Sequence, residues 1–154
     1  MAETTESTQA TESTEATATT ETTAHAPTGH EATIDAYVRF WNAASPDEGE
    51  RLAATAFSDG IRYHALIGTL SGPAELAAFR DEFTREVGPA VFRPRAEAQI
   101  LSDRARLRWE LEAGGRQPFA TGTDVLVFGR DGRIDSVSAF LDQAPEGFTP
   151  QAHP

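Results

Sequence analysis

Residues 106–112 read RLRWELE, and this stretch decides the fold class. Apolar side chains occupy every second position and arginine or glutamate the positions between, which predicts a strand with one buried and one charged face. Turn signals at residues 102–103, 114–115 and 130–132 divide residues 91–142 into four such strands, joined as a meander. The predicted inward face of the central strand consists of Leu107, Trp109 and Leu111.

Two helices are predicted ahead of these strands. In residues 31–44, large apolar side chains recur at the i, i+3, i+4, i+7 spacing of an amphipathic helix. Ser45 then stands at an N-cap, with proline at the first helical position and Glu48 three residues after the cap, so a second helix is predicted to run to about Phe57. The apolar stripe of the first helix is Ile34, Tyr37, Val38 and Trp41.

A third helix is predicted after a first strand. Residues 58–60, Ser-Asp-Gly, are predicted to break the chain before a strand at 61–67, and residues 68–73 are predicted as a loop. The third helix has an apolar stripe and is ended by Gly88-Pro89. Its stripe is Leu76, Phe79, Phe83 and Val87.

Helices followed by antiparallel strands indicate an α+β fold. We expect a cone-shaped fold in which three N-terminal helices pack in a curved, mainly antiparallel sheet. Such a sheet leaves a hydrophobic mouth where a small ligand can bind.

Composition limits the domain organisation and the partners. The 154 residues carry 13 basic side chains, all arginine, against 24 acidic ones, and this net charge of -11 argues against nucleic acid. Residues 1–30 are rich in Thr and Glu and poor in large apolar side chains, which predicts a disordered acidic tail. We expect one domain at 31–145 and a C-terminal tail at 146–154. Without a cysteine, signal sequence or membrane segment, the chain is expected to be cytoplasmic and not to bind a membrane.

Two stretches carry a family resemblance. Residues 34–72, IDAYVRFWNAASPDEGERLAATAFSDGIRYHALIGTLSG, and residues 122–142, GTDVLVFGRDGRIDSVSAFLD, resemble the nuclear transport factor 2-like superfamily. Within it they are most similar to SnoaL-like polyketide cyclases and ketosteroid isomerase. This resemblance implies the cone-shaped fold and a homodimer formed through the outer face of the sheet.

The resemblance also implies site residues. Tyr37 stands where ketosteroid isomerase has its oxyanion-hole tyrosine, and Asp124 where it has the partner carboxylic acid. Ala65 stands where that family has its general-base aspartate. On the residues' own chemistry, an acid among apolar neighbours is pushed toward its neutral form and can donate a hydrogen bond to a developing oxyanion. Ketosteroid isomerase is known for that chemistry. The small Ala120 and Gly122 beside this acid are expected to leave room for a substrate.

His64 is the third candidate catalytic residue. It is the one histidine expected within the folded region, His30 being assigned to the tail, and its ordinary pKa near neutrality suits a proton carrier. Strand alternation points inward at Tyr63 and Ala65 and so turns His64 outward, which favours a structural role. A lone histidine with no cysteine predicts no metal site.

We therefore expect a cofactor-free enzyme that moves a proton on a hydrophobic, polyketide-type carbonyl compound through an enolate, as an isomerase or cyclase. The main alternative is a non-catalytic module of the same fold that binds a small molecule or dimerises. A weaker one is an epoxide hydrolase of the limonene type, suggested by Arg108-Trp109-Glu110, although Ala139 stands at the position of its third acid. The expected substrate-binding residues are Trp41, Tyr63, Phe79, Phe83, Trp109, Leu126, Val137, Ala139 and Leu141.

Overall fold

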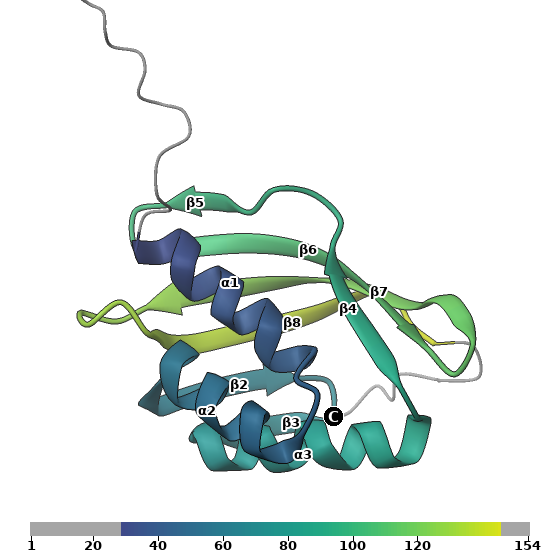
Figure 1. Cartoon of the computed structure of the whole chain (residues 1–154). Helices are drawn as coiled ribbons and strands as arrows, with labels where there is room; N and C mark the ends of the chain where they lie inside the picture. The colour runs from purple at the N-terminus through teal and green to yellow at the C-terminus, as the bar shows by residue number, and fades with distance from the viewer. Residues whose placement is uncertain (1–28, 146–154) are drawn as a thin grey trace, which may run out of the picture.

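The computed structural model describes residues 29–145, which form three helices and a curved sheet of seven strands (Figure 1). The predicted tails at 1–28 and 146–154 lie outside the described residues. The elements are α1 (Gly29–Trp41), α2 (Pro46–Ala56), β2 (Phe57–Ala65), β3 (Gly68–Ser71), α3 (Pro73–Val87), β4 (Ala90–Pro94), β5 (Gln99–Leu101), β6 (Arg104–Ala113), β7 (Arg116–Phe128) and β8 (Ile134–Gln143).

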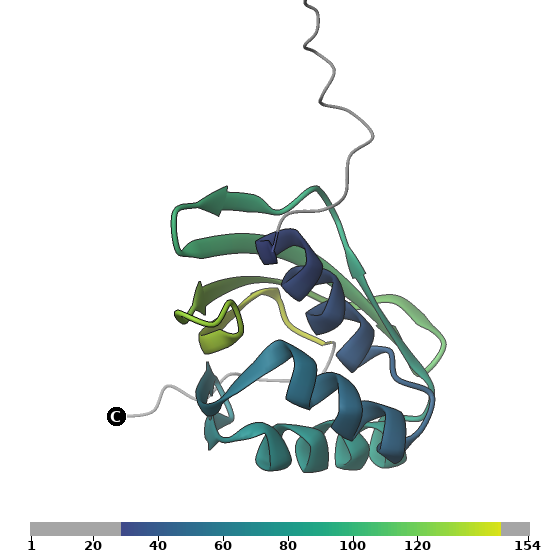
Figure 2. The same cartoon turned by 60° about the vertical axis from the view of Figure 1, so that its left-hand side comes forward.

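The sheet is mixed and mainly antiparallel. Its strand order is β3-β2-β8-β7-β6-β4, with β5 paired to β6, and the one parallel pair along this path is β2 with β8. The three helices lie in the curve that the strands make, as Figure 2 shows from a second direction. The predicted α+β cone is therefore confirmed.

The predicted helices form, with small shifts at their ends. Helix α1 begins at Gly29, so the expectation that His30 lies in the tail is wrong: its ring stacks on Phe128 with 4.1 Å between centroids. Helix α2 has the predicted cap, because Ser45 Oγ accepts a hydrogen bond from the Glu48 amide at 3.1 Å. Glu48 Oε1 in turn accepts a hydrogen bond at 2.9 Å from the amide of Ala44, the residue before the cap.

Three strand predictions are corrected. The predicted loop at 68–73 contains β3, which pairs antiparallel with β2. The predicted break at 58–60 lies inside β2, where the pairing with β8 shifts register between Phe57 and Arg62. Residues 90–143 form five strands rather than four, since the short β5 pairs with the end of β6.

Helix α1 is tied to the outermost strand β4 by one side chain. Asn42 Nδ2 donates to the Phe92 carbonyl and the Phe92 amide donates to Asn42 Oδ1, both at 2.8 Å. The side-chain amide therefore pairs with β4 as a backbone would, and it fixes the distance between helix and sheet on this side of the cavity. Among residues 29–145, no helix has the length and apolar character needed to cross a membrane.

Candidate active site

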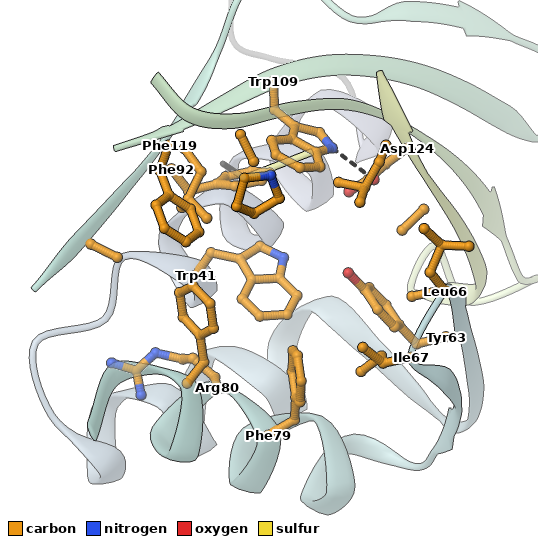
Figure 3. A pocket seen from close by; sticks show the side chains of 18 of the residues that line it. Trp41, Tyr63, Leu66, Ile67, Phe79, Arg80, Phe92, Trp109, Phe119 and Asp124 are labelled. Atoms are coloured by element: carbon orange, nitrogen blue, oxygen red, sulfur yellow. Dashed lines mark hydrogen bonds between the residues drawn. The ribbon is translucent and has the colours of Figure 1, made fainter. Parts of the chain in front are cut away.

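A cavity of about 630 Å³ lies between the helices and the concave face of the sheet (Figure 3). Seven of the nine predicted substrate-binding residues line it, and so does Asp124. These seven are Trp41, Tyr63, Phe79, Phe83, Trp109, Ala139 and Leu141. The apolar and aromatic character of this set suits a hydrophobic ligand of moderate size.

Leu126 and Val137 do not line the cavity. Both are fully buried in the core and pair with each other across β7 and β8. They face the same side of the sheet as Asp124 and Ala139 but lie two residues away from them, Leu126 after Asp124 and Val137 before Ala139, where core packing replaces the cavity. Alternation identified their face correctly and could not show where along the strand the cavity ends.

Several lining residues were not predicted. The turn between β2 and β3 brings the half-exposed Leu66 and Ile67 to the cavity, and strand β4 brings Phe92. Polar and charged side chains of α3 also line the cavity. The further unpredicted lining residues are Arg80, Thr84, Glu86, Ala90, Leu111, Phe119, Phe140 and Pro145.

Asp124 is held by two hydrogen-bond donors. The Tyr37 hydroxyl, from α1, lies 2.6 Å from one carboxyl oxygen, and Trp109 Nε1, from β6, donates to the other at 2.8 Å. Trp109 is the diagonal cross-strand neighbour of Asp124, since β6 and β7 pair Leu107 with Asp124 and Trp109 with Gly122. The resemblance pointed to Tyr37 as a partner, whereas Trp109 was expected only as a lining residue.

Burial sets the protonation of this acid. Asp124 is 1% exposed, and burial raises its pKa from 3.8 to about 6, while the hydrogen bonds from Tyr37 and Trp109 work in the opposite direction. Burial and the neighbouring Asp124 charge raise the pKa of Tyr37 well above its ordinary value. Tyr37 therefore stays protonated, and Asp124 changes its charge close to neutral pH.

The expected pair of Tyr37 and Asp124 is brought together, in an arrangement that differs in one respect. Tyr37 has no exposed surface and does not line the cavity; its hydroxyl is engaged by Asp124. Only the carboxyl group of the pair reaches the cavity wall. This geometry makes Tyr37 a support of Asp124 rather than a second group facing a substrate.

His64 lies away from the cavity. Its side chain is exposed on the other face of β2, and its Nδ1 lies 3.3 Å from Thr69 Oγ1 on β3. The residues on either side, Tyr63 and Ala65, line the cavity, as strand alternation indicates. The catalytic role considered for His64 does not fit this placement, and we assign it none.

The space beside Gly122 is not free for a substrate. A Cβ built there would overlap Trp109 and would come within 2.5 Å of the Phe140 carbonyl oxygen. The glycine therefore makes room for the indole that holds Asp124. The expectation that Gly122 leaves room for a substrate is wrong. Ala120 does line the cavity.

The epoxide-hydrolase arrangement is not present. Arg108 is exposed on the outer face, and Glu110 faces Arg93 across the β4–β6 pair, with 3.6 Å between their charged atoms. Ala139 lines the cavity where that reaction would need an acid. In the part of the chain that the structure describes, no three His, Asp or Glu side chains come together as a metal site.

The chain is similar to proteins of a known family. The sequence profile of the SnoaL-like domain matches residues 34–137. No curated protein sequence shows a significant match to the chain.

Solved structures share the fold at low sequence identity. A proposed isomerase of the SnoaL-like family from Agrobacterium tumefaciens superposes with a TM-score of 0.69 at 24% identity, over 74% of this chain and 97% of that one. A proposed polyketide cyclase from Sinorhizobium meliloti gives 0.58 at 15%, over 70% and 93%. A Catenulispora acidiphila protein with a ketosteroid isomerase-like fold, in complex with trimethylamine, gives 0.60 at 18%, over 77% and 97%.

Proposed function

Because the chain belongs to the SnoaL-like domain family, whose profile covers residues 34–137, we propose that it is a cofactor-free enzyme acting on a hydrophobic carbonyl compound. The reaction is a proton transfer through an enolate, of the isomerase or cyclase type. One observation carries this proposal: a buried carboxyl group, that of Asp124, stands at the wall of an apolar cavity with its pKa raised to about 6. Such a group can accept and return a proton near neutral pH.

Asp124 would act first as a base. Its carboxylate takes a proton from the carbon next to the substrate carbonyl, and the C–H electron pair becomes the enolate. The protonated carboxyl then returns the proton to another carbon, giving an isomer. Alternatively, the enolate carbon attacks a second carbonyl of the same substrate, and the alkoxide formed in closing the ring takes the proton from the carboxyl group. Atoms and charge balance in both outcomes without an external oxidant or reductant.

The other residues adjust this acid. The hydroxyl of Tyr37 and the indole of Trp109 fix the orientation of the carboxyl group and keep its pKa from rising further. The aromatic lining surrounds the enolate with apolar groups, which makes each hydrogen bond to it stronger than in water. The names of the solved relatives, a proposed isomerase and a proposed polyketide cyclase, support the reaction class.

The test is exchange of carbon-bound hydrogen. We expect the protein to accelerate loss of the α-hydrogen NMR signals of 2-tetralone, a small hydrophobic ketone, in deuterated buffer. Asp124→Asn should reduce that acceleration about a hundredfold or more, which is the usual contribution of a general acid or base. Asp142→Asn is the matched control, because Asp142 bonds to Thr123 on the exposed face. Equal rates for wild type and Asp124→Asn would remove Asp124 from the mechanism.

A binding module remains the second candidate. It is favoured by Ala65, which lines the cavity where ketosteroid isomerase, by resemblance, has its general base. A protein of this kind would bind hydrophobic ketones and return them unexchanged. The same exchange experiment, paired with calorimetric binding, therefore separates the two candidates.

A further inference from the structure

Two hydrogen-bond donors at the site, the Tyr37 hydroxyl and the Trp109 indole, are engaged by Asp124. A tyrosine hydroxyl has one hydrogen to donate and an indole has one. Tyr37 lies at 2.6 Å from one oxygen of Asp124 and Trp109 at 2.8 Å from the other. While these two hold the carboxylate, neither has a hydrogen left for a substrate.

Tyr63 is another donor in the cavity lining, and it lies differently. Its side chain rises from β2 on the concave side and lines the cavity, and its hydroxyl points into the open space below Asp124 (Figure 3). The hydroxyl also interacts with the Tyr37 side chain through a hydrogen bond that acts to lower the Tyr63 pKa. A hydroxyl at the wall of an apolar cavity is suited to a ligand oxygen, because that oxygen would otherwise be buried there without a partner.

Sheet geometry places Tyr63 within reach of a substrate that also touches Asp124. Strand β8 separates their strands, pairing Tyr63 with Val137 on one side and Asp124 with Ala139 on the other. The small side chain of Ala139 lines the cavity between them. The indole of Trp41 packs against the Tyr63 ring, with 5.8 Å between centroids, and restricts its orientation.

We propose that Tyr63 is the residue that binds the substrate carbonyl oxygen and stabilises the enolate formed at Asp124. This inference rests on the proposed function and extends it: the substrate is a flat hydrophobic ketone whose oxygen contacts β2 while its adjacent carbon faces β7. The rest of such a molecule lies against the aromatic side chains of Phe79 and Phe92.

Tyr63 acts here by hydrogen bonding and not by giving up its proton. Burial, and then the charge of Asp124, raise the pKa of Tyr63 well above its ordinary value. The hydroxyl therefore remains protonated while negative charge grows on the substrate oxygen. A hydrogen bond that strengthens as charge develops favours the transition state over the bound ketone.

The test is binding, measured by calorimetry, of 2-naphthol and of naphthalene, which lacks the hydroxyl oxygen. The wild-type protein should bind 2-naphthol more tightly, and Tyr63→Phe should reduce this preference about tenfold while leaving the naphthalene affinity unchanged. The retained naphthalene affinity reports that the variant is folded. Phe79→Leu is the matched control, because it should weaken both ligands by the same factor.

The inference is overturned if the wild type shows no preference for 2-naphthol, or if Tyr63→Phe keeps the full preference. This readout needs no turnover. A lost preference in Tyr63→Phe combined with no α-hydrogen exchange would refute the proposed function and leave Tyr63 as a binding residue. If α-hydrogen exchange depends on Asp124 and Tyr63→Phe keeps the preference for 2-naphthol, the proposed function stands and the role of Tyr63 is refuted.

Discussion

Replacing Asp124 by asparagine should change how the stability of the protein depends on pH. Asparagine has nearly the same shape as aspartate and does not ionise, so the substitution removes one titration and little volume. The difference in unfolding free energy between the wild type and Asp124→Asn, measured at each pH, then isolates the contribution of this carboxyl group. Other titrating groups cancel in that difference.

The expected magnitude follows from the pKa shift. The pKa of Asp124 is raised from 3.8 to about 6 in the folded protein, so between these values the folded state binds more protons than the unfolded state. Folding stability from this group therefore falls as the pH rises through that window. One pKa unit corresponds to about 1.4 kcal/mol, so the wild type should lose about 3 kcal/mol relative to Asp124→Asn.

The assay is urea unfolding of both proteins at several pH values from 4 to 7, followed by tryptophan fluorescence or circular dichroism. The wild type should be relatively more stable at the acidic end, and the difference should level off above about pH 7. A difference that stays constant with pH would show that the carboxyl has an ordinary pKa. Asp124 would then not be a proton carrier near neutral pH, whatever the activity of the variant.

Three further predictions concern the surroundings of this acid and the assembly. Tyr37→Phe removes a hydrogen bond that lowers the pKa of Asp124, so an NMR titration of that carboxyl should give a higher pKa; an unchanged one contradicts the support role. Gly122→Ala should destabilise the fold by about 1–3 kcal/mol in urea unfolding, because its Cβ meets Trp109 and the backbone of β8, whereas Gly60→Ala, with open space around it, should change little. Light scattering should give twice the chain mass of 16.6 kDa, as expected for a homodimer, and a monomer mass would refute that expectation.

Local patterns predicted most of the fold because the forces that produce them are local. The helix α2 depends on a cap within one turn, and the inward face of β6 depends on alternation along a single strand. By contrast, β3 and β5 are short strands that exist because β2 and β6 lie beside them. Their four and three residues carry too little periodicity to be recognised alone.

The candidate site was predicted in part, for a related reason. Tyr37 and Asp124 are 87 residues apart, and only the family resemblance joined them. Trp109 as a partner of Asp124 requires the register of β6 against β7, which no single-strand pattern contains. His64 was the opposite case, since alternation alone indicated its outward placement and the chemical suitability of histidine was the weaker argument.

The asparagine that follows α1 has a consequence for aggregation. A strand at the margin of a sheet exposes backbone amides and carbonyls to which a strand of another molecule can add. On β4, the groups of Phe92 that would receive such a strand already bond to the side chain of Asn42. The same contact that sets the cavity width thus protects this margin from intermolecular strand addition.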